Sequence, residues 1–224
     1  MIKALALTQE GKTLRIEGYP DAIAFKRIEG KHAVRLRAMT LHDADLTRCW
    51  EALQALASDD NAKDSILRDC LWIAAVALYF KCFGNSKARC QLDAKAVFKT
   101  QSSAMPAFQY FDALRNKHIL HDENAYTQSF VGIVVNPVSN RYKVADVVSS
   151  GVDAITSDPS HVKSLSTLVN ATRVWVAAER DRLHKMLADE YEAKPYEVLL
   201  AMPNVQIKVP TASQVKDIRA DAQG

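Results

Sequence analysis

Few glycines, few prolines and no long apolar run mark this chain of 224 residues. Its 7 glycines and 7 prolines exclude a collagen-like protein and argue against extensive disorder. The longest apolar run, residues 71–80, has about half the length of a membrane-spanning helix, so we expect a buried core helix and no membrane partner. The apolar opening turns polar at Thr8, too early for a secretory signal. We therefore expect a cytoplasmic protein.

Several familiar site patterns are also missing. The sequence contains no phosphate-binding P-loop, no dinucleotide-binding glycine fingerprint and no Gly-x-Ser-x-Gly elbow. The four cysteines, Cys49, Cys70, Cys82 and Cys90, form no Cys-x-x-Cys pair, which argues against structural zinc. We interpret them as reduced thiols that serve as small core residues. A net charge of +3 permits an anionic partner but does not demand one.

What is present is mostly helical periodicity. Thr40 can cap a helix over residues 41–58, with Asp43 and Asp45 in its first turn. A helix over residues 62–83 is apolar nearly all round in its second half, which is typical of a bundle centre or a subunit interface. The pattern further predicts a short helix over 92–98, a helix from 104 to about 118, and a long helix over 159–191.

Strand signals are fewer. Residues 1–39 look extended, and the alternation of Val34 and Leu36 with basic residues predicts a strand over 32–39. A solvated strand face is the simpler interpretation of these basic residues, and an RNA-contacting edge is the alternative. Segments 130–135 and 142–148 flank a turn-rich loop and predict a β-hairpin, and residues 205–209 predict a short strand.

Together these patterns predict a mainly α fold, a helical bundle with a small β-hairpin insertion and an extended, partly β N-terminal arm. We expect a single domain over residues 1–224. Its helical core spans about 41–192, the arm spans 1–39, and the C-terminal tail spans 193–224.

The densest group of chemically capable side chains lies where the fourth helix ends. Arg115, Asn116, Lys117, His118 and His121 follow an apolar-periodic segment and precede a polar loop. Cleavage of RNA without metal needs a base for the 2′-hydroxyl, an acid for the leaving 5′-oxygen and a cation for the charge on the phosphate. Histidine titrates near neutral pH, and arginine offers a planar charged fork that matches phosphate.

Five residues separate Arg115 from His121, and a polar Asn116 follows the arginine. This arrangement resembles the signature of the HEPN (higher eukaryotes and prokaryotes nucleotide-binding) superfamily. The resemblance implies a small helical bundle with the motif at the end of an inner helix. It further implies a metal-independent endoribonuclease of a toxin or antiviral defence system, without cofactor, that dimerises so that two motifs face one cleft. An antitoxin or activator protein is a further expected partner.

In this interpretation Arg115 holds the phosphate, His121 transfers protons and Asn116 positions them. His118 is an auxiliary candidate, and Lys117 is a phosphate neighbour or a solvated charge. Two simpler explanations stand beside this one. Arg115 could instead pair with Asp112, three residues earlier, and a histidine near a helix C-terminus is favoured by the helix dipole alone.

Two alternative functions remain open. His118, His121 and Asp122 resemble part of an HD-type metal-dependent phosphohydrolase, for which His42 with Asp43, His161 and His184 could supply further ligands. Alternatively, the chain is a non-catalytic helical module that dimerises or binds nucleotide or nucleic acid, with Arg115 and His121 in structural roles.

Overall fold

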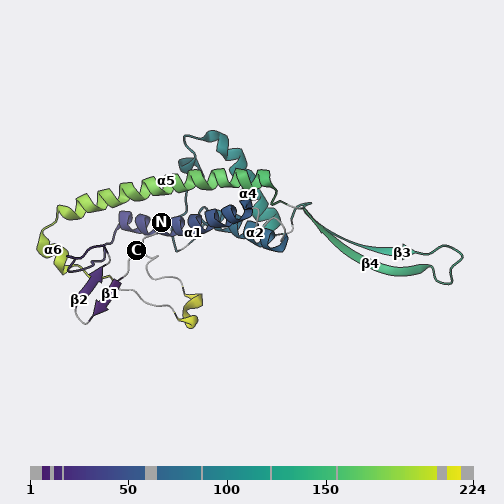
Figure 1. Cartoon of the computed structure of the whole chain (residues 1–224), viewed down its shortest axis with the longest axis horizontal. Coiled ribbons are helices and arrows are strands. Elements are labelled where there is room, and N and C mark those ends of the chain that lie inside the picture. The colour runs from purple at the N-terminus through teal and green to yellow at the C-terminus, as the bar shows by residue number, and fades with distance from the viewer. Residues whose placement is uncertain are drawn as a thin grey trace. The chain divides into compact units, whose positions relative to one another are not determined.

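The computed structural model confirms the predicted mainly α fold with a β-hairpin (Figure 1). It describes residues 7–10, 13–16, 18–58, 65–86, 88–121, 123–154, 156–205 and 211–217. The chain divides into two compact units, each described by itself below. The first unit is Met1–Arg48, Lys81–Val97 and Asn170–Gly224, and the second unit is Cys49–Phe80 and Phe98–Val169. The expectation of one domain over 1–224 stays a prediction.

Two long helices supply residues to both units: α1, Lys31–Ala57, and α5, Pro159–Glu192. The first unit adds α3 (Ala94–Val97), α6 (Tyr196–Ala201), the 3-10 turn η4 (Ala212–Lys216) and an antiparallel pair of β1 (Leu7–Glu10) with β2 (Thr13–Ile16). Its buried apolar side chains include Ala38, Met39, Leu46, Cys82, Leu92, Val176, Leu183 and Leu187.

The second unit contains nearly all of α2 (Ser65–Lys81), η2 (Ser102–Ala104), α4 (Met105–Leu114) and the π turn η3 (Arg115–Ile119). It also contains an antiparallel hairpin of β3 (Thr127–Val135) and β4 (Val144–Asp153). Its core is built from aromatic and aliphatic side chains, including Leu53, Trp72, Val76, Tyr79, Phe80, Phe98, Phe111, Leu114 and Leu165.

The start of α1 corrects one prediction. The helix begins at Lys31, ten residues earlier than expected, and the predicted strand over 32–39 is wrong. Thr40 lies inside the helix, where its hydroxyl donates to the Leu36 carbonyl (3.1 Å), so it is no N-cap. Alternation over a few residues also fits a helix, and this segment is rich in Ala, Arg, Leu and Met, which are good helix formers. Gly30, at φ +99°, turns the chain just before the helix.

The later elements follow the predictions more closely. Helix α5 has nearly the expected bounds. The hairpin is longer than expected at its base, where β3 begins three residues earlier and β4 ends five residues later, whereas β4 begins two residues later than expected at the loop end. The N-terminal arm is partly β, as predicted, but its strands are β1 and β2. Most of the predicted strand over 205–209 lies outside the described residues. The short helix α6 was not predicted, because six residues after a proline carry little periodicity.

The four cysteines differ in burial. Cys49 and Cys82 are buried thiols, as expected, whereas Cys70 and Cys90 are exposed, so the core interpretation is wrong for these two. All four are free of disulfides. Among the described residues, no helix is both long and apolar enough to cross a membrane.

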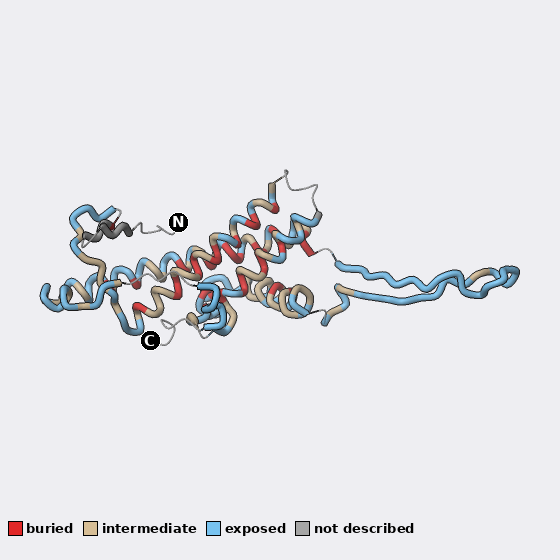
Figure 2. Tube along the Cα trace, turned by 90° about the horizontal axis from the view of Figure 1, so that it is seen from below, coloured by how far each residue is buried: buried red, intermediate tan, exposed pale blue. Residues whose placement is uncertain are grey.

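The hairpin β3–β4 is exposed along nearly its whole length (Figure 2). Its exposed side chains are mainly apolar, among them Phe130, Val131, Ile133, Val135, Val147 and Val152. The register pairs Thr127 with Asp153 at the base and Ile133 with Val147 further out. Since a two-stranded ribbon gains little stability alone in water, this hairpin adds little to the core of its unit.

Candidate active site

Four of the five predicted motif residues, Arg115 to His118, lie in a single π turn at the end of α4. The backbone N–H of Leu120 donates to the carbonyl of Arg115 (2.9 Å), five residues back, which widens the helix at Arg115–Ile119. Helix α4 itself is fixed by Phe111 and Leu114, both almost fully buried. The ring of Phe111 makes an edge-on contact with Trp72, with centroids 6.0 Å apart. π turns inside helices are rare and are often found at functional sites.

Asp112 holds two of the motif side chains. The amide of Asn116 donates to its carboxylate (3.2 Å), and an Arg115 Nη1 lies 3.8 Å from the same oxygen. The ion pair expected as the simpler explanation of Arg115 is therefore present. At 3.8 Å it is too long for a hydrogen bond, so the guanidinium keeps donor capacity for a second anion. The Arg115 side chain is 28% exposed, which leaves it reachable by a ligand.

Lys117 and His118 are engaged on either side of this pair. Lys117 forms a hydrogen-bonded ion pair with Glu123 at the exposed surface. The hydrogen bond from Lys117 lowers the pKa of the Glu123 carboxyl. His118 Nδ1 lies 3.3 Å from the Thr127 hydroxyl, and its ring makes an edge-on contact with Tyr126. Because Thr127 is the first residue of β3, His118 anchors the base of the hairpin.

His121 follows the π turn and is exposed. Within the described part of the chain its ring takes part in no hydrogen bond or ion pair, although it lies close enough to Glu123 to contribute to the lowered pKa of that carboxyl. The structure thus joins Arg115 and Asn116 through Asp112, ties His118 to the hairpin, and leaves the His121 ring open to solvent. Two cavities, one beside Leu56 and Arg68 and one beside Phe25 and Arg37, are lined by other residues.

Tyr126 contacts the motif, and Tyr110 contacts Tyr126. Tyr110 stacks on His161, with ring centroids 5.2 Å apart and planes 6° from parallel. Burial, followed by a hydrogen bond with Tyr126, raises the pKa of the Tyr110 phenol to about 12. Tyr126 is 38% exposed and also touches His118. Exposed aromatic rings are platforms on which unpaired bases stack.

The described residues do not bring together the ligands of the alternative metal site. Asp122 lies outside the described residues, and His161 is paired with Asp158 at the start of α5. His42 is buried, with its Nε2 donating to the Cys90 carbonyl (2.8 Å). Among the residues that the structure describes, no three histidines, cysteines or acids gather in a way that could hold a metal ion.

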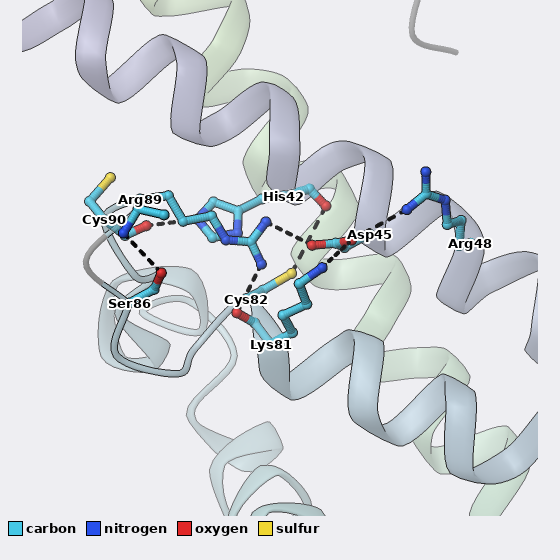
Figure 3. A network of polar contacts seen from close by, with 9 residues as sticks. His42, Asp45, Arg48, Lys81, Cys82, Ser86, Arg89 and Cys90 are labelled. Carbon is cyan, nitrogen blue, oxygen red and sulfur yellow. Dashed lines mark hydrogen bonds and ion pairs between the residues drawn. The ribbon is translucent and has the colours of Figure 1, made fainter. Parts of the chain in front are cut away.

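A buried polar network in the first unit was missed by the sequence reasoning (Figure 3). Asp45, expected at the exposed start of a helix, has a side chain only 5% exposed. It accepts hydrogen bonds from Arg89 (2.7 Å) and Lys81 (3.2 Å), and Arg48 lies 3.8 Å away. Arg89 also donates to the Lys81 carbonyl (3.0 Å), which fastens the loop after α2 to that helix end.

Next to this network lies His42, which is fully buried. Since Nε2 donates to the Cys90 carbonyl, Nδ1 is the unprotonated nitrogen, and among the described residues it has no hydrogen-bond partner. Burial, aided by the nearby Arg89, lowers the pKa of His42 from 6.5 to about 4. Asp43, also expected in a first turn, instead pairs with Arg180 of α5. Polar residues at core-facing positions of α1 were the available signal, hidden by the misplaced helix start.

Comparison with known proteins adds no relative: no protein-family model, no curated protein and no solved structure matches this chain.

Proposed function

We propose that this chain is a metal-independent endoribonuclease of the HEPN type. The observation that carries the proposal is the π turn, where Asp112 orients Arg115 and Asn116 immediately before an exposed His121. A cation, a polar positioning group and an open imidazole at one helix end supply the cation and one of the two proton-transfer groups that the reaction needs. The exposed ring of Tyr126 beside them supports a single-stranded RNA substrate.

In this reaction one imidazole takes the proton of the ribose 2′-hydroxyl, whose oxygen then attacks the adjacent phosphorus. The bond from phosphorus to the 5′-oxygen breaks, and a second acid protonates that oxygen. The products are a 2′,3′-cyclic phosphate and a 5′-hydroxyl. Arg115 stabilises the charge on the phosphate oxygens, and Asn116 orients the phosphate by hydrogen bonds. His118 acts as a positioning residue through Thr127, and Lys117 adds positive charge beside the phosphate.

One motif offers one open histidine, and the reaction uses a base and an acid, so we place the active form as a homodimer. Helix α2 supports this arrangement. Ile66, Cys70 and Ile73 recur at i, i+4 and i+7, and all three are exposed on one face of the unit that carries the motif. An apolar stripe of this kind fits a second copy of the same helix. The toxin or defence role, a cytoplasmic location and an antitoxin or activator partner belong to the same proposal.

The direct test is cleavage of single-stranded RNA in EDTA by wild type, Arg115→Gln and His121→Gln. We expect wild type to release 2′,3′-cyclic phosphate ends and both variants to lose at least about 100-fold in rate, in line with the loss of an acid–base group. His32→Gln, on α1 and outside the motif, is the matched control and should cleave as wild type does. Circular dichroism of each variant confirms that the fold is retained.

Other outcomes point to the alternatives. Loss of cleavage in EDTA with recovery on adding Mg²⁺ or Mn²⁺ would favour the phosphohydrolase interpretation. RNA binding without cleavage by any of the folded proteins would favour the non-catalytic module. For the dimer, Ile73→Asp should give a monomer by light scattering, whereas Val174→Asp, on an exposed position of α5, should not.

A further inference from the structure

A cavity in the first unit lies away from the motif in the chain. Its volume is about 880 Å³, within the range of small-molecule sites. Helix α1 and the C-terminal part of α5 each contribute one wall. The third wall is a pair of strand-like segments from opposite ends of the chain. Arg27 N–H donates to the Pro203 carbonyl (2.7 Å), and Val205 N–H donates to the Phe25 carbonyl (2.9 Å).

The floor of this cavity is apolar. Ala33 of α1 and Leu187 of α5 are buried beneath it, and Leu36 and Tyr191 are half-buried at its sides. Phe25 closes the side formed by the paired segments. The Lys194 ammonium lies 3.8 Å from the centroid of the Tyr191 ring, so one face of this ring already makes a cation–π contact. An apolar or aromatic molecule of modest size would find contact on all these surfaces.

The rim is basic. Lys26, Arg27 and Arg37 line the cavity together with a single acid, Glu29. Arg27 pairs with Glu29 at 3.3 Å. In the part of the chain that the structure describes, Lys26 and Arg37 have no carboxylate partner, although both are only half-exposed. Two positive charges beside the apolar floor therefore lack a carboxylate partner within the described residues.

Other cations of the same unit show that this is unusual. Arg35, two residues before Arg37, pairs with Glu179 at 2.6 Å, and Arg89 pairs with Asp45 at 2.7 Å. Arg180 is paired in the same way with Asp43. Half-buried cations in this unit thus normally have an acid, because partial desolvation without a partner is unfavourable. Among the described residues, Lys26 and Arg37 have no carboxylate partner, and both line a cavity. A bound anion would supply the missing negative charge.

From this juxtaposition we infer a ligand site for a small organic anion that joins a phosphate or carboxylate group to an apolar or aromatic body. The anionic group lies against Lys26 and Arg37, where the arginine fork suits two oxygens of one group. The body lies over Leu187, between Phe25 and Tyr191. Two sources share this chemistry: a nucleoside phosphate, whose base stacks on the aromatic rings, and an acyl carboxylate, whose chain covers the aliphatic floor. The site is independent of the proposed cleavage reaction.

The test is calorimetric titration of the full chain with AMP, with decanoate and with inorganic phosphate. We expect one of the two organic anions to bind and inorganic phosphate to bind at least about tenfold more weakly, because it lacks the apolar body. Arg37→Gln and Lys26→Gln should each weaken that binding roughly tenfold or more, the usual effect of losing a charged hydrogen bond. Lys31→Gln, an exposed residue of α1 outside the cavity, should leave it unchanged.

A second variant separates loss of binding from loss of folding. Ala188 lines the cavity but is itself exposed, so Ala188→Trp fills the space without disturbing the core. It should abolish binding and leave the melting temperature within about 2 °C of wild type. Binding that survives Ala188→Trp and Arg37→Gln would overturn the inference. So would absence of binding for both organic anions, or equal binding of inorganic phosphate.

Discussion

Stability of the protein should fall as the pH drops below about 6.5, and His42 should be the cause. In the folded chain this imidazole is fully buried and its pKa is about 4, against 6.5 for an ordinary histidine. The unfolded chain therefore takes up a proton in a pH range where the folded chain does not. His42 contributes its full stability above pH 6.5, and that contribution is lost as the pH falls towards 4.

The size of the effect follows from the two pKa values. Each pH unit between them corresponds to about 1.36 kcal/mol, so the whole interval is worth about 3 kcal/mol. Between pH 6 and 5 the free energy of unfolding should drop by about 1 kcal/mol from this residue alone. Of the groups that face His42, the Cys90 carbonyl and Asp45 favour its protonation, whereas Arg89 and Arg35 disfavour it; burial is the largest contribution and keeps the pKa low.

Urea unfolding followed by circular dichroism at 222 nm between pH 7.5 and 5 measures this dependence. The pKa of Glu179 is lowered to about 2, first by the Arg182 hydrogen bond, so its stabilisation is lost only as the pH falls below about 4.5. The two effects therefore separate. His42→Gln keeps a donor for the Cys90 carbonyl but cannot titrate, and its stability should be flatter in this range. His32→Gln, on the same helix, should retain the slope. Equal slopes for wild type and His42→Gln would refute the reasoning.

Three further predictions concern packing and pairing. Asp45→Ala should destabilise the first unit by about 3–5 kcal/mol in urea unfolding, because it removes the carboxylate partner of the nearly buried Arg89, whereas Glu190→Gln at an exposed pair should change little. Phe111→Ala should cost about 3–5 kcal/mol in the same assay, and a change below about 1 kcal/mol would contradict the packing described here. Replacing residues 130–150 by Asn-Gly joins Ser129 to Gly151, which are register partners, and should shift the melting temperature by less than about 2 °C; a larger fall would show that the hairpin packs on the helices.

The sequence alone determined most of the element types and most of their positions. Helix α5 is recognisable because apolar residues recur along it at helical spacing, and β3 and β4 because β-branched residues flank a turn-rich loop. The motif residues were also recognisable, since Arg115, Asn116 and His121 are close in sequence and end an amphipathic helix. These residues are neighbours along the chain, so their spacing in the sequence is enough to recognise them. Their activity stays a prediction.

Only the tertiary structure decided which charged side chains are buried and which are paired. Nothing local distinguishes Asp45 in an exposed first turn from Asp45 buried in mid-helix, because its partner Arg89 lies 44 residues away. The helix start went wrong for a related reason: a short alternating run fits both a strand and a helix, and burial of Ala38 and Met39 selects the helix. The cavity likewise depends on Phe25 meeting Val205 across the length of the chain. Contacts between distant residues set burial, and burial sets which charges need partners.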